Sequence, residues 1–331
     1  MKIQGQNRSI GIGLITLVVF FSVTTFSGNL VAQTKADFPQ KEITILVAFA
    51  PGGARDIIAR GVGNVMSRHL GVPMVVNNMP GAGGARGMIS LYHAAPDGYT
   101  IGVGTLSDII SQVVEPQDFD CKRFTYIGYA QHSTPIWYVK WDSPFRSIVD
   151  FKKSGKPIRH STPSMTQNST IGAMIVANRI GFPMVIVGGY KSTADSLLGV
   201  IRGEAEFCHA ALNVGISYVR NKQIRPILAV DRARPPEFPD TQTIGEAGHP
   251  DLEILATDYW FMGPPGVPKA RQQILETALV KTLKDPEFLK WAKTADVEPK
   301  MVSSEDTLKN VMKAFGLMEQ YKGDIEKYLK Q

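Results

Sequence analysis

Residues 50–56 have the residue types and spacing of a small-anion site. A run of β-formers from Ile45 to Ala50 ends at Pro51, and Gly52 and Gly53 follow before a helical pattern begins. A strand that turns into a helix leaves the first helical N–H groups without carbonyl acceptors, and the helix dipole adds partial positive charge there. Glycine lets a ligand approach the backbone because it has no Cβ. The loop therefore predicts an anion site, although a tight connection could carry the same residues.

Two further loops could add donors. Gly188 to Thr193 follows a short strand and precedes another helical pattern. Residues 161–170 are rich in hydroxyl groups, which can donate hydrogen bonds without adding a fixed charge. Both loops favour binding of a carboxylate.

Motifs of enzymes and metal sites are incomplete in this sequence. Gly81-x-Gly83 has Arg86 where a dinucleotide fingerprint needs its third glycine, and residues 189–192 lack the upstream glycine of a phosphate loop. No Gly-x-Ser-x-Gly motif occurs, and the six histidines have no metal-ligand spacing. Asp56 could act as a general base, but a helix-capping role is favoured. We therefore predict no catalytic residue, no metal and no cofactor.

The elements that must position these loops alternate between strand and helix. The pattern predicts strands at 43–50, 73–77 and 99–104, with helices at 56–69 and up to about 93. Such alternation predicts a parallel sheet whose ligand crevice lies at the carboxyl ends of the strands, where the loops at 50–56 and 104–107 belong. A second α/β unit is predicted from strands at 157–161, 184–187, 206–211 and 224–230. A last helix is expected from about 305 to 329, with an apolar stripe at Leu308, Val311, Met312, Phe315 and Met318.

The first 32 residues have the composition of a secretory signal peptide. Lys2 and Arg8 precede an apolar stretch at 10–26, and Ala32 offers a small residue for cleavage. The stretch is shorter than the roughly 20 residues that a membrane span needs. Residues 33–331 suffice for two domains. The net charge of the whole chain is only +6 and its basic residues are dispersed, which disfavours nucleic-acid binding. Cys121 and Cys208 are expected to be separate thiols.

Several short motifs occur in a fixed order along the chain. They are Phe38-Pro39, Pro51-Gly52-Gly53 with Asp56, residues 78–84, 95–100, Gly104-Thr105, Gly189-Tyr190-Lys191, Phe238-Pro239-Asp240, residues 246–248 and residues 263–268. In these motifs and their order the chain resembles the tricarboxylate-binding receptors of bacterial tripartite tricarboxylate transporters, often called Bug receptors. The similarity covers nearly all of the chain after the signal peptide.

The resemblance implies an α/β fold of the periplasmic binding protein type, in which two lobes close on a ligand like a Venus flytrap. A mostly parallel sheet would lie in each lobe. Residues 33–133 with 256–331 would form the first lobe and residues 134–255 the second. Crossings near 130–136 and 253–261 would make the hinge. The implied protein is a periplasmic monomer that passes a small carboxylate to the membrane components of a tripartite transporter.

The resemblance also implies that backbone groups of one loop in each lobe bind the ligand carboxylate. Arg55 stands where the family usually has a small polar residue. It could be a solvated arginine at the rim, or its planar guanidinium could bind a second carboxylate. The implied ligand-binding residues are Phe49, Ala50, Pro51, Gly52, Gly53, Ala54, Arg55, Asp56, Thr105, Ser107, Ser161, Thr162, Thr166, Ser169, Gly189, Tyr190 and Lys191.

The identity of the ligand and two alternative functions stay open from the sequence. Ala210 and Ala211 replace the Asp-Asn often found in the family, and the hydroxyl-rich loop lacks the usual glycines and histidine. The ligand could be a dicarboxylate, a tricarboxylate, an acidic amino acid or an aromatic acid. Tyr190 and Trp260 could stack on an aromatic ligand or pack as wall and core. The alternatives are a periplasmic sensor that signals to a membrane kinase and a secreted α/β enzyme that acts on a carboxylate.

Overall fold

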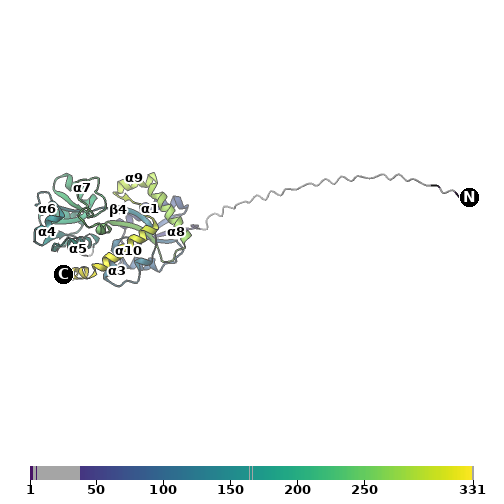
Figure 1. Cartoon of the computed structure of the whole chain (residues 1–331), viewed down its shortest axis with the longest axis horizontal. Coiled ribbons are helices and arrows are strands. Elements are labelled where there is room, and N and C mark those ends of the chain that lie inside the picture. Colours follow the sequence, from purple (N-terminus) through teal and green to yellow (C-terminus); the bar gives the residue numbers. More distant parts are fainter. Residues whose placement is uncertain (3–4, 6–37, 164, 166, 330–331) are drawn as a thin grey trace. The chain divides into compact units, whose positions relative to one another are not determined.

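The computed structural model describes residues 1–2, 5, 38–163, 165 and 167–329 (Figure 1). The predicted signal peptide lies almost entirely outside this part of the chain. Within the described residues, no helix is both long enough and apolar enough to span a membrane. Two β-sheets organise the fold, and helices cover both faces of each.

The first sheet has the strand order β11-β4-β10-β3-β1-β2. β1 pairs in parallel with β2 and β3, whereas β10 is antiparallel to both β3 and β4. Its strands are β1 (Ile43–Val47), β2 (Met74–Asn78), β3 (Thr100–Gly104), β4 (Thr125–Ser133), β10 (Thr257–Gly263) and β11 (Glu298–Pro299).

Alternation of side chains along β1 gives this sheet two apolar faces. Ile43, Ile45 and Val47 point to one face and Leu46 to the other. The first face packs against α1 (Ala54–Leu70), α8 (Lys269–Lys284) and α9 (Pro286–Ala295). The other packs against α2 (Ala85–Tyr92), α3 (Leu106–Val114) and α10 (Ser304–Gln320).

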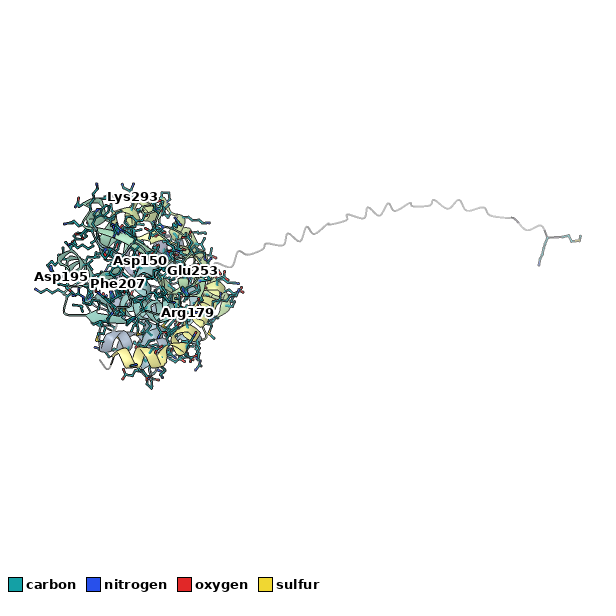
Figure 2. The ribbon with its side chains drawn as sticks, turned by 60° about the vertical axis from the view of Figure 1, so that its left-hand side comes forward. Asp150, Arg179, Asp195, Phe207, Glu253 and Lys293 are labelled. Atoms are coloured by element: carbon teal, nitrogen blue, oxygen red, sulfur yellow. The ribbon has the colours of Figure 1, made fainter. Side chains whose placement is uncertain are left out.

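The second sheet has the order β7-β6-β8-β5-β9. The helices α4 (Ile148–Lys153) and α5 (Asn168–Ile180) cover one face, and α6 (Thr193–Arg202) and α7 (Leu212–Arg220) cover the other. Figure 2 labels Phe207, a fully buried residue of the core on the first of these faces. The strands of this second sheet are β5 (Pro135–Lys140), β6 (Ile158–Ser161), β7 (Met184–Val187), β8 (Phe207–Ala211) and β9 (Ile224–Ala229).

The two-lobed α/β architecture is confirmed, but the sheets are mixed rather than mostly parallel. β10 returns to the first sheet against the direction of its neighbours, and β5 enters the second sheet antiparallel to β8 and β9. The physical reason is the double crossing, because a chain that leaves one sheet and later returns must run in opposite directions on the two passages.

The chain passes between the sheets twice. β4 continues through Thr134 into β5, and the 3₁₀ helix η3 (Pro250–Leu255) leads back into β10. Figure 1 shows β4 between the group of α4 to α7 and the group that includes α1, α8 and α10. The limits predicted for the two lobes stay a prediction.

Strand direction shows where the predicted ligand loops lie. β1, β3 and β4 run in the same direction, so the ends of β1 and β3 lie at the edge of the first sheet from which β4 crosses. In the second sheet, Pro135 at the start of β5 pairs with Ala211 at the end of β8, and β6 and β7 are parallel to β8. The loops after β1, β3, β6 and β7 therefore all lie at the two edges that the crossing joins.

The predicted final helix is two helices. α10 ends at Gln320 and α11 (Lys322–Leu329) follows after Tyr321. Val311, Phe315 and Met318 are buried as predicted, but Leu308 and Met312 are exposed. The apolar stripe was therefore predicted too wide.

Further helices are α3, α7, α9, η1 (Ala82–Gly84) and η2 (Cys121–Arg123), which the sequence pattern did not predict. Both cysteines are buried and free.

Candidate functional site

The first predicted ligand loop, residues 50–56, leaves backbone donors unused. α1 begins at Ala54, and its N-cap Gly53 makes no side-chain capping bond. Among the described residues, no hydrogen-bond acceptor faces the N–H groups of Gly53, Ala54 or Arg55. Residues 51–54 are exposed. Three donors at a helix N-terminus thus have no acceptor within the described protein, as in the anion sites that helix N-termini form.

Asp56 holds this loop in place. One carboxylate oxygen accepts from the N–H of Gly52 at 2.9 Å and from Arg60 Nε at 2.9 Å, and the other accepts from Asn78 Nδ2 at 2.9 Å. The hydrogen bond from Arg60 is the main cause that lowers the pKa of Asp56 to about 2. Asp56 occupies the third helical position, not the N-cap. Its carboxylate therefore bonds the N–H of Gly52, which precedes the helix, as the third-position residue of a capping box does. A carboxylate of such low pKa with this set of donors is a poor general base.

Arg55 is buried, with only 7 % of its surface exposed. Its Nη1 forms an ion pair with Asp108 at 2.9 Å, and its Nη2 donates to the hydroxyls of Thr105, at 2.8 Å, and Ser107. The guanidinium also lies over the ring of Phe49, 4.5 Å from its centroid. The interpretation of Arg55 as a solvated arginine at the rim is therefore wrong. The burial of Arg55 follows from this network, which no local pattern around residue 55 reveals.

The network joins the first turn of α1 to the first turn of α3. Thr105 caps α3, and the carboxylate of Asp108 accepts from the N–H of Thr105 at 2.8 Å. Thr105 and Ser107 thus lie beside the α1 loop, as the resemblance implies. Phe49 belongs to the same group, because its carbonyl accepts from Asn78 at 3.0 Å. Asn78 and Asp108 hold residues of the candidate site in place, and the sequence pattern did not predict either of them.

The second predicted ligand loop, residues 188–193, repeats the construction of the first. Asp195, at the third position of α6, accepts from the N–H of Lys191 at 3.1 Å, four residues earlier. Ser192 caps the helix by accepting from the N–H of Asp195 at 3.1 Å. Gly189 adopts a positive φ of 92°, and Gly52 in the first loop has a φ of 86°. In the sequence, an aspartate follows four residues after Gly52 and again four residues after Lys191. This recurring spacing is the sequence signal that indicates the shared construction of the two loops.

The aromatic candidates are anchored to the protein. The hydroxyl of Tyr190 donates to Glu204 at 2.8 Å, and its ring packs on Gly199. Burial, together with Glu204, raises the pKa of Tyr190 to about 12. Trp260 is only 4 % exposed and stacks on Tyr129, with 5.7 Å between ring centroids. Trp260 is therefore a core residue.

The hydroxyl-rich loop uses its first hydroxyls internally. Ser161 is fully buried and donates to the carbonyl of Ser196 at 2.9 Å. The hydroxyls of Thr162 and Thr170 are 2.7 Å apart and buried. Ser169 is half-buried, and its hydroxyl lies 3.5 Å from Oε1 of Gln167. Thr166 lies outside the described residues.

A charged cluster lies at the crossing between the sheets. His132 of β4 contacts Asp231 through Nε2 and Asp258 of β10 through Nδ1, both at 2.5 Å. Thr134 donates to the same Asp231 at 2.6 Å. Burial opposes the charge on His132, but the two carboxylates outweigh it and raise its pKa to about 9. This cluster was not predicted.

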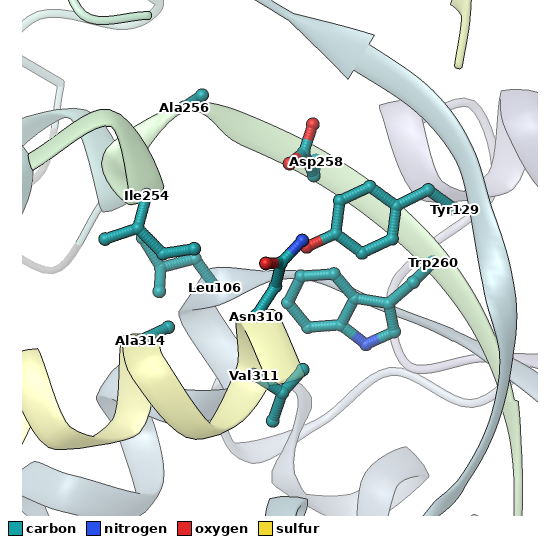
Figure 3. A pocket seen from close by; sticks show the side chains of 9 residues that line it. All are labelled: Leu106, Tyr129, Ile254, Ala256, Asp258, Trp260, Asn310, Val311 and Ala314. Carbon is teal, nitrogen blue, oxygen red and sulfur yellow. The ribbon is translucent and has the colours of Figure 1, made fainter. Parts of the chain in front are cut away.

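A small pocket lies beside this cluster, between β4, β10, η3 and α10 (Figure 3). Figure 3 shows the phenol of Tyr129 next to the amide of Asn310, with Trp260 below and Asp258 above. Its lining residues come from β4, from the segment that leads from η3 into β10, and from α3 and α10, and none of the predicted ligand-binding residues is among them.

Comparison with known proteins identifies the family. Residues 58–317 match the family described as the tripartite tricarboxylate transporter family receptor. The chain belongs to this family. One relative of this receptor is protein BugT of Bordetella pertussis, which is 25 % identical over 272 residues covering 76 % of the chain and 79 % of BugT. The resemblance to the Bug receptors is therefore confirmed.

Solved structures agree with the fold. A TctC solute-binding protein from Polaromonas matches this receptor with a TM-score of 0.76 and 17 % identity, over 86 % of this chain and 99 % of that protein. A protein from R. palustris solved with adipate matches with a TM-score of 0.64 and 23 % identity, over 89 % of this chain and 99 % of that protein. The receptor thus has the fold of periplasmic solute-binding proteins.

Proposed function

We propose that this receptor captures a small carboxylate between the α1 loop and the α6 loop and delivers it to the membrane components of a tripartite transporter. The observation that carries the proposal is the uncapped N-terminus of α1, with three unused N–H donors at the edge of the sheet that faces the crossing. An anion is the ligand that such donors favour. The adipate bound to the R. palustris protein supports a carboxylate.

The proposed contacts divide into donors and supports. The N–H groups of Gly53, Ala54 and Arg55 would bind from the first lobe. In the second loop, the N–H groups of Gly189 and Tyr190 also face no acceptor among the described residues. Phe49, Ala50, Pro51, Gly52 and Asp56 would shape the first loop, and Ser161 and Thr162 would hold the second. Thr105, Ser107, Thr166, Ser169 and Lys191 complete the proposed site.

The remaining parts of the proposal concern export and closure. The first 32 residues would be removed on export to the periplasm, and the mature protein would act as a monomer. Residues 33–133 with 256–331 would close against residues 134–255 when the ligand binds. We also propose that no bond of the ligand is made or broken. The low pKa of Asp56 supports this part, because it removes the first candidate for a general base.

The test uses the mature protein, residues 33–331, with acetate, adipate and citrate as probes. A ligand present at a hundredfold excess over its Kd raises the free energy of unfolding by about 2.7 kcal/mol, so melting temperature reports binding. The variant Ala54→Pro removes one proposed donor. Proline is well tolerated at the first helical position, and Gly53 already has the extended conformation, with ψ of 166°, that a following proline prefers.

Lys269→Pro is the matched control, because Lys269 is the exposed first residue of α8 and lies outside the proposed site. We expect Ala54→Pro to weaken binding about tenfold or more, the cost of a hydrogen bond to a charged group, and Lys269→Pro to leave it unchanged. If the wild type and Ala54→Pro bind the probes with equal affinity, the α1 loop is not part of the binding site. Failure of every carboxylate to bind would end the proposal.

A further inference from the structure

Arg55 begins a chain of hydrogen bonds that ends at Ser107. Arg55, Thr105 and Asp108 are 7 %, 3 % and 5 % exposed, whereas Ser107 is half-buried. Nη1 of Arg55 is engaged by both oxygens of Asp108, at 2.9 and 3.1 Å. Nη2 is left to donate its two protons to the hydroxyls of Thr105 and Ser107. Both Nη2 protons are therefore used within the network, while one Nη1 proton can serve both oxygens of Asp108.

The lone pairs of Thr105 fix the direction of its own proton. Its Oγ1 accepts from Arg55 Nη2 at 2.8 Å and from the N–H of Ser107 at 3.3 Å. A hydroxyl has two lone pairs and one proton, so these two donors fill its acceptor capacity. Its proton is then donated to Oγ of Ser107, 2.8 Å away.

The same count applies to Ser107. Its Oγ accepts from Arg55 Nη2 and from the hydroxyl of Thr105, which fills both lone pairs. Its own proton has no acceptor among the described residues. A half-buried hydroxyl with full lone pairs and an unused proton can act only as a donor.

We propose that Ser107 is a directed hydrogen-bond donor to the ligand carboxylate and that Arg55 is a positioning residue that acts through it. This inference rests on the proposed function. Two positively polarised donors feed into Ser107, and chains of hydrogen bonds strengthen one another in a site of low dielectric. The guanidinium of Arg55 thereby contributes to carboxylate binding through Ser107, while Asp108 balances its charge.

The first comparison is between Ser107→Ala and Ser111→Ala, with adipate, acetate and citrate as probes in isothermal calorimetry. Ser111 lies one turn further along α3 and makes no side-chain hydrogen bond among those of the described residues, so it is the matched control. Both substitutions leave the ion pair of Arg55 with Asp108 in place. We expect Ser107→Ala to weaken binding about ten- to hundredfold, as for loss of a hydrogen bond to a charged acceptor, and Ser111→Ala to have no effect.

The second comparison tests whether Arg55 acts through Ser107. Arg55→Lys keeps a positive charge for Asp108 but cannot also supply both hydroxyls. We expect it to weaken binding about three- to tenfold in the wild-type background and by less than twofold in the Ser107→Ala background. A direct contact between Arg55 and the ligand would instead give losses that multiply in the double variant.

The outcomes separate the two proposals. Binding by Ser107→Ala within twofold of the wild type would overturn the inference while the proposed function stands. Multiplying losses in the double variant would overturn the role of Arg55 alone. If the wild type binds none of the probes, the proposed function fails first and the inference fails with it. Because Ser107→Ala does not disturb the buried pair, the first comparison holds even if Arg55→Lys does not fold.

Discussion

The α1 and α6 loops share one construction but differ in how firmly they are held. In both, an aspartate at the third helical position accepts from a backbone N–H four residues earlier. Each loop also has a glycine of positive φ, Gly52 in the first and Gly189 in the second. Asp56 is buried and has three further contacts with Arg60 and Asn78, whereas the bond between Lys191 and Asp195 is exposed. Ser192 caps α6, and no side chain caps α1.

The difference suggests separate roles for the two loops. The first loop is fixed before any ligand arrives, and its uncapped helix keeps its donors unused. In the second loop, the N–H of Asp195 in the first turn of α6 is already bonded to the capping Ser192, and fewer hydrogen bonds hold the loop in place. Preorganised donors lose little conformational freedom on binding, so we expect the first loop to supply most of the affinity and the second to complete the site.

The largest expected effect separates Asp56 from Asp195. Asp56→Ala leaves the Gly52 N–H, Asn78 and Arg60 without their acceptor, and we expect a loss of about 3 kcal/mol in the free energy of unfolding. Asp195→Ala removes exposed bonds, and we expect less than half that loss. Urea unfolding of the two variants gives the comparison. Similar losses would show that the two loops are equally supported.

The second expected effect concerns His132, which ties the crossing strands to Asp231 beyond β9. The pKa of His132 rises from 6.5 to about 9 on folding, so its contribution to stability is complete below pH 6.5 and is lost as pH rises through 9. We expect a loss on the order of 2 kcal/mol between pH 6.5 and 10. The charged groups that face His132 are Asp231, Asp258 and Lys300.

His132→Gln is the control for this pH dependence. It keeps a polar side chain but has no group that titrates in this range, so its unfolding free energy should change less between pH 6.5 and 10. Urea unfolding of both proteins at each pH measures the difference. Identical pH profiles would show that His132 does not hold a proton more tightly in the folded protein.

The sequence predicted the parts of this fold that depend on local pattern. Strand β1, the turn at Pro51 and the helix start follow from β-formers, glycines and helical spacing, all within a dozen residues. The burial of Arg55 depends on Asp108, 53 residues away, and the His132 cluster joins residues 99 and 126 positions apart. Periodicity carries no information about such pairs, since only the folded topology brings them together.

The smallest expected effect tests the second loop directly. The N–H of Thr193, at the first position of α6, faces no acceptor among the described residues and is a further candidate donor of this loop. Thr193→Pro removes it, and Ser192 has the extended conformation, with ψ of 167°, that suits a following proline. If the second loop completes the site, this change weakens probe binding by about 1 kcal/mol or less, and less than Ala54→Pro does. Calorimetry of both proline variants with one carboxylate gives the ratio directly. A larger loss of affinity in Thr193→Pro than in Ala54→Pro would reverse the roles of the two loops. The second loop, which has fewer supports, would then contribute the stronger donors. Closure of the lobes would in that case determine which ligand binds more than the preformed first loop does.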